Sequence, residues 1–422
     1  MMNARSPAVS PAEYPLMSSP SGTSAKAEER PSPGTPSERQ LSPGLDFPQS
    51  ALVGSLGDLA KILAAGTEVP EEFYFVCALT MLGLLCETKL HLNVAAECEP
   101  RLYTVLLGAS ADVKKSTAMR RTISFFTEKV DFLGSRSLGK KIVYGVGSAE
   151  GLARKLNEVG NLLLCYDELQ AFITKSSIEG SVLLQATTSL YEQTHWSSTV
   201  KNPKSSMQVN NGHLSLLGCC TIETYSNMWS PEAIAIGFPN RLFLVSAERK
   251  VRVAWPKTPD PEELCAVGDR IVKQLARLPL TLQITPDAKA RWEEWYLSLP
   301  PSEHTKRLDT LGFRLLSLIA LCTDKDVVDI ETVEVVCSIL SYEFRLRVLT
   351  DPIDADNQIA KVEQKIRRTL TARGPLTKRN LVRFSNATRE GAWAFERAVT
   401  AMKSTGEVIL VGTLFQLADG PR

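Results

Sequence analysis

The stretch of residues 102–126, LYTVLLGASADVKKSTAMRRTISFF, constrains the fold of this chain more than any other. Residues 102–107 are an apolar run typical of a buried strand, and the run ends at Gly108. Small, polar and charged residues follow, and residues 115–126 then carry apolar side chains at helical spacing. The sequence therefore predicts a strand, a loop and a helix in direct succession.

A loop of this kind suits a polyphosphate, because backbone N–H groups and the positive end of the helix point to one place. Lys115 would add a charge for the β- and γ-phosphates, and Ser116 an oxygen for Mg²⁺. The stretch departs from the pattern G-x-x-x-x-G-K-[ST], because Lys115 comes one residue late after Gly108 and Lys114 replaces the second glycine. K-K-S-T alone also fits a solvated helix start, so the phosphate site depends on the rest of the chain.

Length and composition set wide limits. A chain of 422 residues has room for about two or three domains. The net charge of +1 gives no overall bias toward nucleic acid, so any basic surface must be local. Nine cysteines without C-x-x-C spacing, and no secretory signal, predict reduced core thiols in a cytoplasmic protein. The longest apolar run, residues 73–86, is too short for a membrane span and predicts a buried helix.

The first 48 residues differ from the rest. They hold nine of the 24 prolines and many serines, and we expect a disordered Pro/Ser-rich tail. The alternative, an arm that recruits a partner, has no specific motif. From residue 51 the pattern becomes helical, and residues 141–144 predict a second strand before a helix capped by Ser148. This alternation predicts an α/β domain.

Two carboxylates follow a buried strand in NLLLCYDELQAF, residues 161–172. At the end of such a strand, Asp167 would hold Mg²⁺, directly or through water, and Glu168 would orient and deprotonate the attacking water of an ATPase. The structural alternative is an acidic turn in which both residues only cap the next helix.

Two further residues extend this interpretation. Thr221 ends the apolar run LSLLGCCT and would sense the γ-phosphate, although threonine also commonly closes a strand. Arg241 lies in GFPNR before the strand-like residues 242–245. It would reach into the site of a neighbouring subunit, where a guanidinium stabilises the phosphoryl charge, or else form a surface salt bridge.

Together these segments, with GSAEGLA at residues 147–153, resemble the primase-associated, helicase-like P-loop ATPase family of phages and mobile elements. The resemblance covers about residues 50–350. Its phosphate loop runs G-x-S-x-x-x-[RK]-K-S-T, a pattern that six residues here satisfy: Gly108, Ser110, Lys114, Lys115, Ser116 and Thr117. The resemblance implies a RecA/AAA+ fold with ATP and Mg²⁺, a homo-oligomeric ring such as a hexamer, and action on DNA. Residues 1–50 are too short and too poor in apolar residues for a primase–polymerase domain, so we expect no primer synthesis by this chain itself. A primase or replication protein is a further candidate partner.

Residues 256–355 show apolar positions at three-and-four spacing and predict a helical lid that closes over the nucleotide. Within it, Arg314 would act as a second sensor or be a solvated arginine. Residues 356–422 predict three helices and a hairpin, which is a winged helix. Eleven Lys and Arg against three Glu between residues 361 and 403 favour DNA, through Lys378, Arg379, Arg383, Arg389 and Arg397, although winged helices also dock on proteins.

The sequence thus predicts an α/β P-loop NTPase of the RecA/AAA+ type. Its parts are the tail 1–48, the ATPase core 49–255, the helical lid 256–355 and the winged helix 356–422. The predicted function is an ATP-dependent DNA helicase or translocase of a replication or mobile-element system. The alternatives are a DNA-binding regulator or loader that does not unwind, and a scaffold that no longer hydrolyses ATP. No membrane partner is expected.

Overall fold

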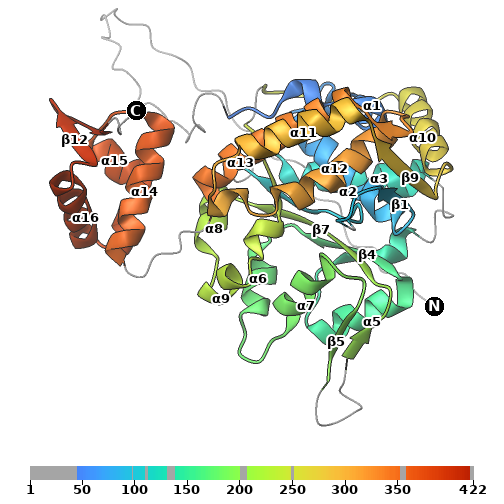
Figure 1. Cartoon of the computed structure of the whole chain (residues 1–422), viewed down its shortest axis with the longest axis horizontal. Helices are drawn as coiled ribbons and strands as arrows, with labels where there is room; N and C mark the ends of the chain where they lie inside the picture. Colours follow the sequence, from blue (N-terminus) through green and yellow to red (C-terminus); the bar gives the residue numbers. More distant parts are fainter. Residues whose placement is uncertain are drawn as a thin grey trace, which may run out of the picture. The chain divides into compact units, whose positions relative to one another are not determined.

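A computed structural model describes residues 45–96, 98–109, 113–130, 138–199, 207–248, 251–351 and 358–418. The predicted α/β alternation is present as a five-stranded parallel sheet with helices on both faces (Figure 1). The strands in spatial order are β3 (Ile142–Tyr144), β4 (Asn161–Tyr166), β7 (His213–Cys220), β2 (Tyr103–Leu107) and β8 (Phe243–Ser246).

The three central strands, β4, β7 and β2, are buried along their whole length. Both faces of a parallel sheet are covered by helices, which explains why these strands are nearly continuous apolar runs in the sequence. Leu107 at the end of β2 pairs with Cys220 of β7 and with Ser246 of β8. The carboxyl ends of neighbouring strands therefore lie along one edge of the sheet.

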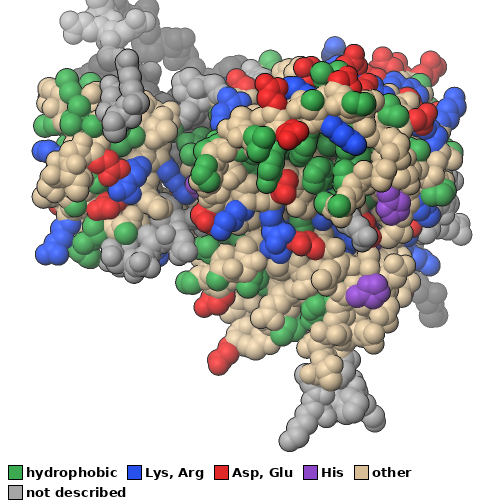
Figure 2. All heavy atoms as spheres, viewed as in Figure 1, with side chains coloured by type: hydrophobic (Ala, Val, Ile, Leu, Met, Phe, Trp, Pro, Cys, Tyr) green, Lys and Arg blue, Asp and Glu red, His purple; other side chains and the backbone are tan. Residues whose placement is uncertain are grey.

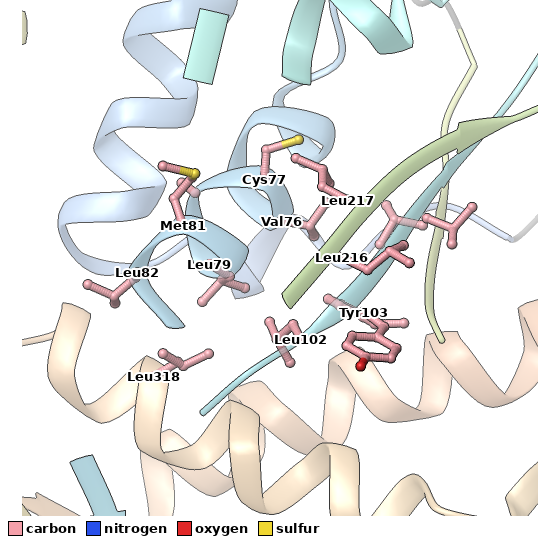
Figure 3. Packing of buried hydrophobic residues seen from close by; sticks show 14 of the residues in the cluster. Val76, Cys77, Leu79, Met81, Leu82, Leu102, Tyr103, Leu216, Leu217 and Leu318 are labelled. Carbon is pink, nitrogen blue, oxygen red and sulfur yellow. The ribbon is translucent and has the colours of Figure 1, made fainter. Parts of the chain in front are cut away.

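Helix α2 (Glu71–Cys86) is apolar around its whole circumference and almost completely buried, which confirms the predicted buried helix. Its side chains pack against β2 and β7, with Leu318 of another helix nearby (Figure 3). Helix α3 (Lys115–Lys129) packs beside it. The other helices of this part are α1 (Gly54–Ala64), α5 (Ala149–Val159), α6 (Gln170–Ser176), α7 (Leu183–Leu190), α8 (Ile222–Asn227) and α9 (Pro231–Ala235).

Short elements connect these helices and strands. They are the 3-10 helices η1 (Gln49–Ala51), η2 (Gly139–Lys141), η4 (Pro239–Arg241) and η5 (Glu303–Thr305), and the antiparallel strands β5 (Trp196–Ser198) and β6 (Met207–Val209).

The predicted helices of the region 256–355 are present as α10 (Pro261–Leu275), α11 (Pro286–Ser298), α12 (Leu308–Cys322) and α13 (Ile330–Thr350). They share one continuous hydrophobic core with the five-stranded sheet. A small parallel sheet, which the sequence did not indicate, joins the two parts: β1 (Leu90–Leu92), β9 (Leu280–Ile284) and β10 (Val327–Val328). This packing does not favour a lid that opens as a unit.

Side chains of α13 complete the hydrogen bonding of β8, the last strand of the sheet. The Leu244 N–H donates to the Glu343 carboxylate at 3.0 Å and 3.2 Å. The Tyr342 hydroxyl accepts from the N–H of Ser246 at 2.7 Å and lies 3.0 Å from its carbonyl oxygen. Arg347 pairs with Glu343 at 2.8 Å and donates to the carbonyl preceding β8 at 2.9 Å. The outer edge of β8 is therefore paired with a helix.

Arg314 of α12 is neither a phosphate sensor nor a solvated arginine, so both alternatives predicted for it were wrong. Its guanidinium is buried and donates to the carbonyls of Arg101 and Tyr191 at 2.7 Å and 2.6 Å. It also lies 3.9 Å from the centroid of the Tyr191 ring. Arg101 precedes β2, at the end of the strand opposite Gly108. The carbonyls at the end of α7 need donors, and Arg314 supplies one for Tyr191 while Arg101 supplies those for Leu190 and Gln193.

The predicted tail extends too far into the chain. Leu45 and Phe47 are buried, and the Phe47 ring packs edge-on against Tyr342 at 5.2 Å between centroids. A segment with two buried apolar anchors is part of the core rather than a solvated tail. Residues 1–44 lie outside the described part of the chain.

The C-terminal residues form helices and a small sheet with a separate hydrophobic core. The predicted three helices and hairpin are present, and the two-residue strand β11 adds to the sheet in the antiparallel order β11-β13-β12. The elements are α14 (Gln358–Arg373), β11 (Leu376–Thr377), α15 (Lys378–Ser385), η6 (Ala387–Glu390), α16 (Ala392–Ser404), β12 (Val408–Val411) and β13 (Leu414–Leu417).

Among the described residues, no helix combines the length and the apolar character that a membrane crossing requires. Lys and Arg are interspersed with Asp and Glu on the face drawn in Figure 2, in keeping with the near-zero net charge.

We expect Arg347→Met to lower the free energy of unfolding by about 3 to 5 kcal/mol at pH 8, because it leaves the Glu343 carboxylate buried without its partner. Burial raises the pKa of Glu343 to about 7, against the opposing effect of Arg347. Since the folded-state pKa lies above that of an unfolded glutamate, the cost is present where the group is ionised and fades as the pH falls below 7. Urea unfolding at pH 8 and pH 5.5 measures both effects.

The matched control is Arg347→Met combined with Glu343→Leu, which removes both charges. It should recover part of the stability at pH 8 and show less pH dependence than the single variant. A single-variant loss that is equal at the two pH values would contradict the interpretation.

Candidate functional site

The candidate site lies at the carboxyl edge of the five-stranded sheet. Gly108 follows β2, Asp167 follows β4 and Thr221 follows β7, and β7 lies between the other two strands. Parallel pairing therefore brings together three segments that are more than 50 residues apart in the sequence. In open parallel sheets this edge is where ligands bind.

The loop of residues 108–114 connects β2 to α3. A Cβ atom on Gly108 would lie 2.4 Å from Cγ2 of Val113 and 3.3 Å from the carbonyl oxygen of Ala247, so the position requires glycine. Lys114 has φ 51° and ψ 37°, in the left-handed region. That conformation favours glycine, the residue that the P-loop pattern has before its lysine. Lys114 therefore departs from the pattern in its side chain while its backbone adopts the conformation that glycine favours.

Lys115 begins α3 and folds back over this loop. Its side chain is 8% exposed, and Nζ donates to the carbonyls of Gly108 and Ala109 at 2.9 Å and 3.0 Å. Burial lowers the pKa of Lys115, while the nearby Cys219 and Glu168 act in the opposite direction. The Lys115 ammonium is thus held by the loop carbonyls, and the Glu168 carboxylate, which follows β4, lies close enough to raise its pKa.

Ser116 and Asp167 both act on the Cys219 thiol near the end of β7. Hydrogen bonding to the Ser116 side chain lowers the pKa of that thiol, and the Asp167 charge raises it. A hydroxyl and a carboxylate are oxygen ligands of the kind that Mg²⁺ prefers, so this pair fits the predicted ion. Within the described residues, no group of three or more His, Cys, Asp or Glu could hold a metal by itself.

The Cys219 thiol is a neighbour of the site that sequence reasoning missed, because it was interpreted only as a core cysteine. Burial raises its pKa to about 12, with Lys115 opposing and Asp167 adding to the effect. The thiol is therefore neutral at physiological pH. The position of this thiol near Ser116 depends on strand register. The one sequence signal for it is that Cys219 lies at the end of an apolar run.

Asp167 and Glu168 are both exposed at the edge of the sheet. Helix α6 has Leu169 as its N-cap and shows no side-chain cap, so the structure gives no support to the alternative in which the two carboxylates cap it. The Leu169 N–H donates to the Cys219 carbonyl at 2.8 Å and fixes this turn against β7. The carboxylates are held beside the loop and are available to a ligand.

Thr221 lies at the predicted edge, but its hydroxyl is already engaged. It caps α8 by accepting from the N–H of Thr224 at 3.1 Å, and it donates to the Thr224 hydroxyl at 2.8 Å. A sensing role requires Thr221 to exchange one of these bonds for a phosphate contact.

Arg241 lies before β8, at the end of the sheet opposite Lys115. It is 8% exposed and donates to the carbonyls of Ile236 and Gly237 at 3.0 Å and 2.8 Å. Glu192 pairs with it at 3.1 Å and also pairs with Arg307. Within one chain, therefore, the structure does not bring Arg241 to the candidate site.

Two predicted phosphate-loop residues complete the set. Thr117 lies in the first turn of α3, where its N–H donates to the Lys114 carbonyl at 3.0 Å. Ser110 lies outside the described residues, so its predicted role stays a prediction.

The predicted DNA-binding residues are exposed on the C-terminal helices. Lys378, Arg379 and Arg383 lie on α15 and Arg397 lies on α16. Lys378 pairs with Glu396 at 2.7 Å. Arg389, in η6, pairs with Glu223 at 2.7 Å.

Comparison with known proteins identifies no family for this chain: no protein-family model matches it, and no curated protein matches it.

We expect Lys114→Gly to be at least as stable as the wild type, because glycine adopts the left-handed conformation without strain. The loss of the ion pair with Glu68, at 4.0 Å, offsets this gain by at most about 1 kcal/mol. Lys114→Val, the matched control, should be less stable than Lys114→Gly by about 1 to 2 kcal/mol. Thermal unfolding compares the two variants, and a valine variant as stable as the glycine variant would argue against a strained loop.

Proposed function

We propose that this chain is an ATP-hydrolysing enzyme of the P-loop type. The observation that carries the proposal is the position of Lys115, whose ammonium donates to the loop carbonyls and lies near Glu168 and Cys219. Ser116 and Asp167 act on the same Cys219 thiol. A lysine held in this way can exchange two carbonyl contacts for phosphate oxygens with little rearrangement. The positive end of α3 and the loop backbone favour the same ligand.

The chain's own residues take distinct roles in this proposal. Lys115 holds the β- and γ-phosphates, and Glu168 orients the attacking water and accepts its proton. Mg²⁺, when bound by Ser116 and Asp167, neutralises phosphate charge. Thr221, between these groups, contacts the γ-phosphate by giving up a bond to Thr224.

The proposed assembly is a ring of the RecA/AAA+ type with ATP between subunits. Arg241 would then act on the site of the next subunit, since it lies away from the site of its own chain. To do so it must exchange the contacts with Glu192 and two carbonyls for phosphate oxygens. A guanidinium is suited to this because it stays charged and binds phosphate bidentately.

We propose DNA as the substrate on which this ATPase acts, as a helicase or translocase of a replication or mobile-element system. The order of three helices and a three-stranded antiparallel sheet in the C-terminal part supports a winged helix. Exposed arginines on α15 and α16 would contact phosphates and bases. The resemblance to primase-associated helicases adds a primase or replication protein as a partner.

A second candidate function has an observation in its favour. The hairpin of β12 and β13 exposes four apolar side chains and no charge: Ile409, Leu410, Val411 and Leu414. Apolar side chains at this position favour a protein contact over phosphate. The chain would then be an ATP-dependent regulator or loader that docks without unwinding, or a scaffold if hydrolysis is absent.

The decisive test is steady-state ATP hydrolysis with and without single-stranded DNA. We expect Lys115→Ala and Glu168→Gln each to lower turnover by at least about 100-fold, because they remove the phosphate charge and the base for water. Lys129→Ala, at the far end of the same helix, is the matched control and should keep wild-type turnover.

The outcomes separate the candidates. DNA-stimulated turnover with strand displacement supports a helicase, and turnover without displacement supports a regulator or loader. If the wild type hydrolyses no ATP above background, the result supports the scaffold that no longer hydrolyses ATP.

We expect Arg379→Ala with Arg383→Ala to weaken binding to duplex DNA and to reduce the salt dependence of the affinity by about two counterions. Arg291→Ala on α11, which removes one arginine outside the C-terminal part, is the control. Fluorescence anisotropy over a range of salt concentrations measures both effects. Unchanged affinity and slope in the double variant would favour protein docking by this part.

A further inference from the structure

A short segment after β8 passes close to the candidate phosphate site. We call residues 251–257 the strap. Strand β8 pairs with β2 and reaches the same carboxyl edge, where the Ala247 carbonyl lies 3.3 Å from where a Cβ of Gly108 would be. The strap therefore begins four residues after Ala247, which lies beside Gly108, the first residue of the loop 108–114.

Two hydrogen bonds fix the strap to the turn between α1 and α2. The Val253 N–H donates to the Glu68 carboxylate at 3.0 Å, and the Lys257 N–H donates to the Gly66 carbonyl at 3.0 Å. The other carboxylate oxygen of Glu68 lies 4.0 Å from Lys114 Nζ. One carboxylate thus joins the strap to the loop that would hold the phosphates.

Trp255 lies in the middle of the strap with 89% of its surface exposed. Among the large apolar side chains of the described residues it is the most exposed. An exposed tryptophan alone has no specific meaning. This one, however, is two residues from Val253, so their Cα atoms are separated by at most about 7 Å. Trp255 therefore lies on a segment that is anchored on both sides to the turn whose Glu68 reaches Lys114 of the loop.

We propose that Trp255 is the platform on which the base of the bound nucleotide stacks. The inference rests on the proposed function, because it assumes that the phosphates bind at Lys115. A nucleoside triphosphate places its base one ribose away from its phosphates, toward the space outside the sheet edge. The flat, apolar indole offers a stacking face, and Arg252 and Lys257 on either side add positive charge for an anionic ligand.

The experiment compares two ligands, magnesium ATP and magnesium tripolyphosphate, which share phosphates and differ in the base and ribose. We expect Trp255→Ala to weaken ATP binding about tenfold or more and to leave tripolyphosphate binding unchanged. Trp255→Phe should keep most of the ATP affinity. In the wild type, ATP and not tripolyphosphate should quench tryptophan emission, and Trp255→Phe should lose that quenching. Trp393→Ala, which removes another exposed tryptophan, is the matched control.

The outcomes distinguish this inference from the proposed function. If Trp255→Ala binds ATP like the wild type, or loses both ligands equally, the stacking platform is wrong while the phosphate site stands. If it loses single-stranded DNA and keeps ATP, the tryptophan serves a DNA base instead and the inference is overturned. If Lys115→Ala binds both ligands as the wild type does, the phosphate site fails and the inference falls with it. Because the Trp255 side chain is exposed, we do not expect Trp255→Ala to lose ATP binding through misfolding. Circular dichroism of the variant checks that its fold is unchanged.

Discussion

The parallel pairing of β2 with both β7 and β8 is the constraint on which the rest of the structure depends. It sets the register that ends all three strands at one edge, and the loops that follow them meet there. The buried helix α2 covers the apolar strands and holds this register, because a slip would expose their side chains or leave backbone groups unpaired. Lys115, Asp167 and Thr221 come to one edge of the sheet only because the strands are arranged in this order.

The candidate site combines a turn that is fixed by a backbone hydrogen bond with a lysine whose hydrogen bonds can be exchanged. The hydrogen bond from the Leu169 N–H to the Cys219 carbonyl fixes the turn after β4 to the end of β7. Lys115, by contrast, is held by two carbonyl oxygens, which a phosphate would replace in the proposed function. A site of this kind keeps its positively charged group desolvated and ready without a large conformational change.

Local patterns predicted most of the framework. The strands β2, β4, β7 and β8 and the helices of the region 256–355 follow from apolar runs and three-and-four spacing, which depend on nearby residues. Arg314 could not be placed in the same way, because its partners are carbonyls distant in sequence. The same holds for the left-handed Lys114, for Glu68 and for the thiol beside Ser116. The positions of these residues depend on strand register and on contacts between segments far apart in the sequence, which no short stretch of sequence reveals.

The attachment of α13 to β8 has a consequence for how copies of this chain can meet. An unpaired edge strand offers its N–H and C=O groups to another chain, and edge-to-edge sheet extension follows easily. Here Tyr342, Glu343 and Arg347 already use those groups. The sheet therefore does not continue through β8 into a neighbour, and the proposed ring would meet at this edge through side-chain surfaces. In the proposed ATPase, such contacts would loosen and re-form during turnover, whereas a sheet shared through β8 would lock the subunits together.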